Sequence, residues 1–159
     1  LRCCYENSRD NARTPMQWTD DENAGFTDGT PWLAMNPNYR QINVREQEAR
    51  TDSVLAYYRR LVHLRKADAY RETFTYGIFE PAYQEMADVF AYYRVSGESG
   101  QRILVAANFG TDAVSLTLAY PCRQVLLSNL RAESAVETAC EKANALTLGS
   151  CEVAVIELG

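Results

Sequence analysis

The chain has 159 residues, of which 47% are hydrophobic and 23% are charged. This composition is that of a globular protein long enough to bury a core, and it excludes a largely disordered chain. The formal net charge is -5 at pH 7, so we expect neither a nucleic acid nor an anionic membrane as a partner.

The first ten residues, LRCCYENSRD, lack the apolar stretch of a signal peptide, and no run of about 18 apolar residues follows them. We therefore expect a cytoplasmic chain. The chain begins with Leu1 rather than methionine, and its first strong secondary-structure pattern lies well inside it. These two features lead us to expect a fragment of a longer protein.

The cysteines do not have the spacing of a metal site. There are five of them: Cys3, Cys4, Cys122, Cys140 and Cys151. No pair has the CxxC or Cys/His spacing that suits zinc, and His63 is the single histidine. We expect no metal, no cofactor and reduced thiols.

Residues 1–50 have the composition of a long loop. They are rich in Asn, Asp, Gly, Pro and Thr, which form turns and side-chain-to-backbone hydrogen bonds. They also carry large apolar side chains, namely Trp18, Phe26, Trp32, Met35, Tyr39 and Ile42. We expect these side chains to anchor the loop against a body, much of which is missing here.

Residues 53–66, SVLAYYRRLVHLRK, predict an amphipathic helix. Apolar residues recur at spacings of three and four, at Val54, Leu55, Tyr58, Leu61 and Val62. Thr51, Asp52 and Ser53 are the candidate N-caps. His63 lies beside the apolar face without an acidic partner at helical spacing, so we expect a structural or solvated role for it rather than a catalytic one.

Beyond residue 70 the pattern changes to a period of two. Seven short runs are rich in β-branched and aromatic residues: 72–80, 88–95, 102–109, 113–118, 124–130, 145–148 and 152–158. Strands without intervening helices predict a mainly β, antiparallel sandwich or barrel. Run 102–109 is apolar on both faces and should be central, whereas Ser115 and Thr117 mark a solvent-facing side.

Few residues could carry catalysis by themselves. No nucleophile motif, phosphate-binding glycine run or metalloprotease motif is present. Asp20, Asp21 and Glu22 are adjacent in a turn, where acids do not face each other across a substrate. We favour a solvated turn over a catalytic carboxylate pair.

The segment SRDNARTPMQW, residues 8–18, is the strongest candidate for a binding site. Arg9 and Arg13 carry planar guanidinium groups that can bond to carboxylates and to vicinal sugar hydroxyls. Asp10 can accept from an arginine or from a sugar hydroxyl. The alternative is an Arg–Asp network that only holds a long loop in place, and local chemistry leaves both possibilities open.

This segment, followed by NAGFTDGTPWLAMNPNYRQINV and SVLAYYRRLVHLRK, closely resembles the C-terminal third of the α-glucosidase branch of glycoside hydrolase family 13, the α-amylase superfamily. Oligo-1,6-glucosidases and trehalose-6-phosphate hydrolases are the nearest types. The resemblance is strongest over residues 8–66 and covers almost the whole chain. Thr19 departs from it, because aspartate is commoner after MQW.

The resemblance implies two regions. Residues 1–70 are expected to be the C-terminal end of a (β/α)8 barrel, with a substrate-side loop and the final helix. Residues 71–159 are expected to be the β-sandwich called domain C, of Greek-key type. A loop at the C-terminal rim of a barrel is where this fold places substrate contacts.

The resemblance also implies a chemistry. The family's catalysis is retaining, with an aspartate nucleophile and a glutamate acid/base about 5 Å apart. A second aspartate stabilises the transition state. These acids come from barrel strands upstream of the matched stretch, so we expect no catalytic residue in this chain. By the resemblance, Arg9, Asp10 and Arg13 are the expected substrate-binding residues: Arg9 and Arg13 would line the pocket of the non-reducing terminal glucose, Asp10 would orient them, and Arg9 is favoured as the sugar contact. The expected partners are α-glucoside oligosaccharides, through the parent enzyme, and the missing N-terminal barrel.

Two other classes of function are considered. One is a non-catalytic β-sandwich that binds carbohydrate or stabilises a barrel; Phe90, Tyr92 and Tyr93 are expected in the core, which speaks against glycan binding. The other is an inactive homologue of the amino-acid transporter heavy-chain type, against which the intact arginine motif argues. Without barrel partners, part of residues 1–66 should either dock on the sandwich or expose a sizeable apolar patch, and we expect self-association or disorder of the first 50 residues.

Overall fold

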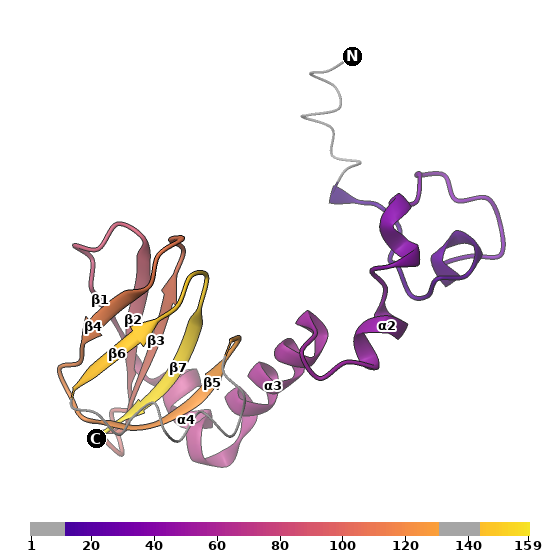
Figure 1. The fold of residues 1–159 in the computed structure, drawn as a ribbon. Coiled ribbons are helices and arrows are strands. Elements are labelled where there is room, and N and C mark those ends of the chain that lie inside the picture. The colour runs from indigo at the N-terminus through magenta and orange to yellow at the C-terminus, as the bar shows by residue number, and fades with distance from the viewer. Residues whose placement is uncertain (1–11, 131–143) are drawn as a thin grey trace. The chain divides into compact units, whose positions relative to one another are not determined.

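The computed structural model describes residues 12–130 and 144–159 of the chain (Figure 1). The chain divides into two compact units, Leu1–Tyr58 and Arg59–Gly159. The division falls within helix α3 (Val54–Lys66).

The first unit is mainly loop, as its composition predicts. Its short elements are the 3-10 turns η2 (Glu22–Gly25) and η3 (Pro37–Arg40) and the helix α2 (Val44–Glu48), followed by the start of α3. The sequence analysis does not predict α2. This helix begins because the Asn43 side chain accepts a hydrogen bond from the Glu46 backbone N–H at 2.9 Å.

Helix α3 confirms the prediction for residues 53–66. Among the three candidate caps, Ser53 has the cap bond, because its hydroxyl accepts from the Ala56 N–H at 3.1 Å. The apolar side chains of Val54, Tyr58 and Val62, four residues apart, are 72%, 63% and 41% exposed. His63 is also exposed, in agreement with a solvated role.

Helix α4 (Asp68–Tyr76) corrects the strand expected over 72–80, which begins only at Ile78. The threonines and aromatics of this run suit a strand, but tertiary contacts select a helix here. Tyr70 and Phe74, four residues apart, meet edge-to-face with 6.5 Å between ring centroids.

Gly77 separates α4 from the first strand. Its N–H donates to the Thr73 carbonyl at 3.1 Å, which closes the last turn of α4. A Cβ at this position would collide with the same carbonyl oxygen. Glycine is therefore required by close backbone approach.

Seven antiparallel strands follow in the described residues, close to the predicted runs. They are β1 (Ile78–Ala82), β2 (Val89–Val95), β3 (Arg102–Asn108), β4 (Val114–Thr117), β5 (Cys122–Ser128), β6 (Ala145–Leu148) and β7 (Val153–Leu158). One sheet has the order β1-β2-β3-β7-β5 and the other pairs β4 with β6. Strand β3 is central, as its apolar pattern predicts. From β3 to β7, successive strands belong to alternate sheets: β3, β5 and β7 lie in the larger sheet, and β4 and β6 form the smaller one.

The two sheets enclose one apolar core, which confirms the β-sandwich. Buried side chains from both sheets form a single cluster: Ala91, Leu104, Ala106, Leu116, Leu118, Val125, Leu146, Leu148, Ala154, Ile156 and Leu158. Ser115 and Thr117 face solvent as predicted, and the Ser115 hydroxyl lies 3.0 Å from that of Thr147.

The aromatic residues of β2 do not all lie in the core. Tyr93 packs against the core cluster, as expected. Phe90 is 57% exposed, so its expected core position is wrong. Tyr92 is half-buried and lies between Phe79 and Phe90, with ring centroids 4.9 and 5.8 Å away. Side chains alternate between the two faces along the strand, so Tyr93 points into the core while Phe90 and Tyr92 lie on the outer face.

Polar side chains connect α4 to the larger sheet. The buried Thr73 hydroxyl donates to the Gln101 side-chain carbonyl at 2.5 Å. The Tyr70 hydroxyl lies 3.4 Å from a carboxylate oxygen of Glu157 in β7. Arg94 of β2 donates to the Phe74 carbonyl at 3.2 Å. These contacts fix the helix on the outer face of the sheet.

The expectation of reduced thiols is wrong for Cys122. This residue at the start of β5 is disulfide-bonded. Cys151 is a free, exposed thiol.

Candidate functional site

The structure describes one of the three predicted sugar-binding residues. Arg9 and Asp10 belong to residues 1–11, outside the described ranges. Arg13 is exposed and directly precedes Thr14, which lines an apolar groove of the first unit. That Arg9, Asp10 and Arg13 lie together in one sugar-binding site therefore stays a prediction.

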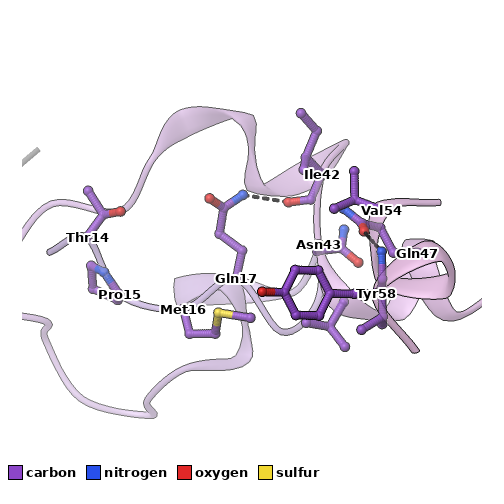
Figure 2. Close-up of a pocket in the computed structure, with 11 residues that line it drawn as sticks. Thr14, Pro15, Met16, Gln17, Ile42, Asn43, Gln47, Val54 and Tyr58 are labelled. Atoms are coloured by element: carbon purple, nitrogen blue, oxygen red, sulfur yellow. Dashed lines mark hydrogen bonds between the residues drawn. The ribbon is translucent and has the colours of Figure 1, made fainter. Parts of the chain in front are cut away.

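The groove is open and has a volume of about 410 Å³ (Figure 2). Its walls are the segment 14–17, the segment 42–47 and the start of α3. The residues that line it are Thr14, Pro15, Met16, Gln17, Ile42, Asn43, Val44, Gln47, Val54, Leu55 and Tyr58. None of these side chains is charged. Figure 2 shows the Tyr58 ring extending from α3 across the groove.

Gln17 holds two walls of the groove together. Its side-chain amide nitrogen donates to the Ile42 carbonyl at 2.5 Å and to Asn38 Oδ1 at 2.9 Å. Its backbone carbonyl accepts from the Val44 N–H at 3.0 Å. The side chain thus satisfies acceptors of Asn38 and Ile42, 21 and 25 residues away, while the backbone carbonyl satisfies the first N–H of α2.

Gln47 holds the third wall. Its side-chain oxygen accepts from the Leu55 N–H at 3.0 Å, and its backbone carbonyl accepts from the Ser53 hydroxyl at 2.7 Å. The first turn of α3 is thereby joined to α2, and one of its free N–H groups, that of Leu55, gains a partner.

Asn43 supports the groove from below its surface. It is 4% exposed, and its side-chain nitrogen donates to the Tyr39 carbonyl at 2.9 Å. Its oxygen caps α2 through Glu46. Asn43 therefore makes hydrogen bonds within the chain with both ends of its amide, whereas Gln17 bonds through its amide nitrogen and Gln47 through its amide oxygen. Most of the other residues that line the groove are apolar.

A tight turn follows the groove segment. The N–H groups of Trp18 and Thr19 both donate to the Ala24 carbonyl, at 2.9 and 3.0 Å. Asn23, Ala24 and Gly25 have positive φ values of 51, 56 and 64°. A Cβ on Gly25 would lie 2.6 Å from the Thr19 hydroxyl oxygen, so glycine is needed here on both counts.

Arg45 binds the acidic residues of this turn. Its guanidinium contacts Asp20 at 2.9 Å and Asp21 at 2.8 Å. The pKa of Asp21 is lowered by its hydrogen bond with Thr19 and then by Arg45, and the pKa of Arg45 is raised by Asp21. The acids are exposed, as predicted for a solvated turn, and their ion pairs hold the loop.

The large apolar side chains of the loop form an exposed surface. Trp18, Phe26 and Ile42 are about half exposed, and Trp32 is 90% exposed. Residues 12–66 therefore carry exposed large apolar side chains, whereas a contiguous patch stays a prediction. Such surfaces mark places where another surface packs.

The described ranges, residues 12–130 and 144–159, hold no side-chain group arranged for a metal ion and no helix suited to span a membrane. No cluster of three or more His, Cys, Asp or Glu side chains is placed there to bind a metal ion. None of the helices in those ranges combines the length and apolar character of a membrane span.

Sequence reasoning missed three residues that organise this region. Asn43 followed by Glu46 has the spacing of a capping box, which could have predicted α2. Gln17 and Arg45 give no local signal, because their partners lie more than 20 residues away.

Comparison with known proteins gives three results. Residues 2–77 match the alpha-amylase catalytic domain. The chain is 42% identical over 129 residues to the glucan 1,6-alpha-glucosidase of Streptococcus pneumoniae, which is 81% of this chain and 23% of that protein. It is 42% identical over 112 residues to the oligo-1,6-glucosidase of Bacillus cereus, which is 70% of this chain and 19% of that protein.

A solved structure is also similar. The isomaltulose synthase of Klebsiella sp. LX3 aligns with a TM-score of 0.83 and 36% identity, over 96% of this chain and 26% of that chain. This similarity agrees with the fold class expected from the sequence. The chain spans about a quarter of the length of that protein and less of the two glucosidases.

Proposed function

Since the chain belongs to glycoside hydrolase family 13, the α-amylase superfamily, we propose that it forms part of a retaining α-glucosidase. The substrates would be short oligosaccharides with α-1,6 or α-1,4 glucosidic bonds. The observation that carries this proposal is the 42% identity over 129 residues to a glucan 1,6-alpha-glucosidase, with a similar identity to an oligo-1,6-glucosidase.

The chain would supply a rim loop of the glucose pocket and a stabilising sandwich domain. The domain boundary expected from the sequence lies between residues 70 and 71. Two observations support a boundary near that point: the catalytic-domain match ends at residue 77, and β1 begins at Ile78.

In this proposal the chain contributes sugar-binding residues and the rest of the parent enzyme contributes the catalytic acids. Arg9, Asp10 and Arg13 would bind the hydroxyls of the terminal glucose, because guanidinium and carboxylate groups suit vicinal hydroxyls. The nucleophile and the acid/base would come from the remaining polypeptide of the parent enzyme. The isolated chain would then bind no sugar productively and catalyse no hydrolysis.

A chimera tests this function. The segment of the Streptococcus pneumoniae glucan 1,6-alpha-glucosidase that matches this chain is replaced by the chain itself, and hydrolysis of a chromogenic α-glucoside is measured. We expect turnover by the chimera and none by the isolated chain. Product analysis with isomaltose and sucrose separates hydrolysis from the isomaltulose synthesis named for the Klebsiella protein.

Substitutions in the chimera test the binding residues. Arg9→Lys and Arg13→Lys keep the charge but lose the planar fork, so kcat/KM should fall by at least about tenfold at the residue that contacts sugar. Arg65→Lys, an exposed position in α3, is the matched control. Turnover by the isolated 159-residue chain, or unchanged kcat/KM in both arginine variants, would refute the proposal.

The alternative function is a carbohydrate-binding module. The exposed rings of Phe79 and Phe90 beside Tyr92 favour it, because aromatic faces on a sheet can stack on sugar rings. This surface lies on the outer face of β1 and β2.

The proposed location is the cytoplasm. The disulfide of Cys122 weighs against it, because structural disulfides persist mainly in oxidising compartments.

A further inference from the structure

We propose that Asp28 is a site of chemical modification, at which the aspartate isomerises to isoaspartate through a succinimide formed with Gly29. The Thr27 hydroxyl restrains this reaction. The inference goes beyond the proposed function, because it concerns the covalent chemistry of the loop itself and requires no substrate other than water.

The residue after Asp28 suits this reaction. A succinimide forms when the backbone nitrogen of the following residue attacks the side-chain carboxyl carbon of an aspartate and closes a ring. A Cβ on the following residue obstructs the attack, and glycine has none. Asp28 is the one aspartate in the sequence that glycine follows. Residue type alone therefore distinguishes Asp28 from the other aspartates.

The dipeptide lies in an exposed, irregular stretch of the first unit. Asp28 and Gly29 are both exposed. They lie between η2, which ends at Gly25, and η3, which begins at Pro37. Ring closure therefore does not have to break a helix or a strand, and water can reach the succinimide to open it.

The carboxyl of Asp28 is not held by a cation. Among the described residues, no ion pair or hydrogen bond involves this carboxyl. Asp52 provides a contrast, because Arg50 binds both of its oxygens at 3.0 Å and lowers the pKa of Asp52 through these hydrogen bonds. The oxygen leaves as water only from the protonated carboxyl, so an arginine-bound carboxylate should react more slowly.

Hydrogen bonds around Gly29 restrain the attacking nitrogen. The Gly29 N–H donates to the Thr27 hydroxyl at 3.1 Å, which directs it toward Thr27 rather than toward Asp28. The Asn23 side-chain nitrogen donates to the carbonyls of Thr27 and Gly29, at 3.3 and 3.1 Å. Removal of the Thr27 hydroxyl should therefore free the N–H and raise the rate of ring closure.

The reaction leaves the mass of the chain unchanged. The Gly29 nitrogen bonds to Cγ of Asp28 and loses its proton, while the carboxyl hydroxyl takes up a proton and leaves as water. Water then adds to the backbone carbonyl of Asp28, the bond from this carbonyl to the Gly29 nitrogen breaks, and the nitrogen regains a proton. The backbone gains a methylene at this position, which should disturb the two hydrogen bonds of Asn23 on either side of it.

Peptide mapping of the full 159-residue chain tests the proposal. The chain is incubated at neutral pH, and isoaspartate is separated from aspartate by chromatographic retention and identified by electron-transfer fragmentation. Thr27→Val removes the hydroxyl but keeps the shape of the side chain, and Thr30→Val, at an exposed position of the same loop, is the matched control. Gly29→Ala adds a Cβ beside the attacking nitrogen.

The Gly29→Ala variant should keep the loop intact. Gly29 is not among the glycines with positive φ, and a Cβ there would lie 3.7 Å from the Thr27 hydroxyl oxygen, an ordinary contact. We expect this variant to form isoaspartate several-fold more slowly than the wild-type chain. Loss of structure cannot explain such a decrease, because unfolding would free the dipeptide to react.

The wild-type chain should accumulate isoaspartate at Asp28 and several-fold less at Asp52. Thr27→Val should raise the rate at Asp28 several-fold, whereas Thr30→Val should leave it unchanged. Three results would each overturn the proposal: no isoaspartate at position 28, equal amounts at Asp28 and Asp52, or equal rates in Thr27→Val and Thr30→Val. None of these measurements depends on the hydrolysis of a glucoside.

Discussion

The carboxylate of Glu157 in β7 accepts a hydrogen bond from the Gln124 side-chain amide in β5, with 2.8 Å between the two atoms. Gln101 donates to the other carboxylate oxygen at 3.0 Å. Glu157 is 9% exposed, so these donors stand in for water. The Gln124 amide also donates to the Tyr70 hydroxyl at 2.9 Å, which brings α4 into the same network.

Replacing Glu157 with Gln should destabilise the sandwich. The substitution keeps the shape but turns one acceptor into a donor that faces Gln101 or Gln124. We expect the free energy of unfolding to fall by about 1–3 kcal/mol in urea titrations, the cost of a buried unsatisfied polar group. Glu98→Gln, in an exposed turn, is the control and should change stability by less than about 0.5 kcal/mol. Equal stabilities of the two variants would contradict the network.

The contribution of Glu157 should depend on pH. Burial acts to raise its pKa, but hydrogen bonds from Gln124, Gln101 and Tyr70 outweigh burial, so the pKa lies below the ordinary value of 4.5. A depressed folded-state pKa gives stability that is fully present above the unfolded-state pKa and is lost as pH falls through the folded-state pKa. The stability difference between wild type and Glu157→Gln should therefore be constant at neutral pH and shrink below pH 4.5. A difference that grows on acidification would rule this out.

The cap of α3 gives a third prediction. Ser53→Ala removes the acceptor for the Ala56 N–H and the donor to the Gln47 carbonyl. We expect a loss of about 1 kcal/mol in unfolding free energy, together with lower helicity by circular dichroism. Ser53→Thr retains both bonds and should behave like wild type, whereas Thr51→Ala controls for an exposed change nearby. Identical helicity in Ser53→Ala and wild type would speak against the cap.

The aromatic cluster on the outer face of β1 and β2 gives a fourth prediction. If it binds glycan, titration calorimetry of the chain with maltose, isomaltose and soluble starch should give saturable heat. Phe90→Ala should then weaken binding by about 1–3 kcal/mol, the range for loss of an aromatic stacking partner. Phe109→Ala, which is 74% exposed and outside the cluster, is the control. Flat traces for the wild-type chain would leave the sandwich a purely structural role.

The thiols give a fifth prediction. Peptide mapping without reductant should find Cys122 in a cross-linked peptide, and iodoacetamide should label Cys151 in the native chain. Labelling of Cys122 before reduction would show that its disulfide is absent in solution.

The strands and the long helix were predictable because they depend on local pattern. Alternation in VFAYYRV and RILVAAN gave β2 and β3 within a residue of their bounds. Residues 72–76 were assigned to a strand, because threonine and aromatic side chains suit a sheet. Their helix depends on Thr73 reaching Gln101, a contact across 28 residues that no window along the chain reveals.

The candidate site was predictable in residue type but not in geometry. The arginine motif and the aromatic loop were recognisable from the sequence. The groove was not, because it is assembled by Gln17 and Gln47, whose partners are set by the path of the backbone. The exposure of Phe90 was missed because a strand pattern alone does not say which of its two faces is covered.

The contact between Tyr70 of α4 and Glu157 of β7 joins positions 87 residues apart. During synthesis, α4 emerges from the ribosome well before its acceptor carboxylate is made. The helix can therefore reach its final position only after Glu157 has been made, so at this surface we expect α4 to dock after strand β7. Truncation by even three residues would remove the acceptor and leave the donors of Gln101, Gln124 and Tyr70 facing one another.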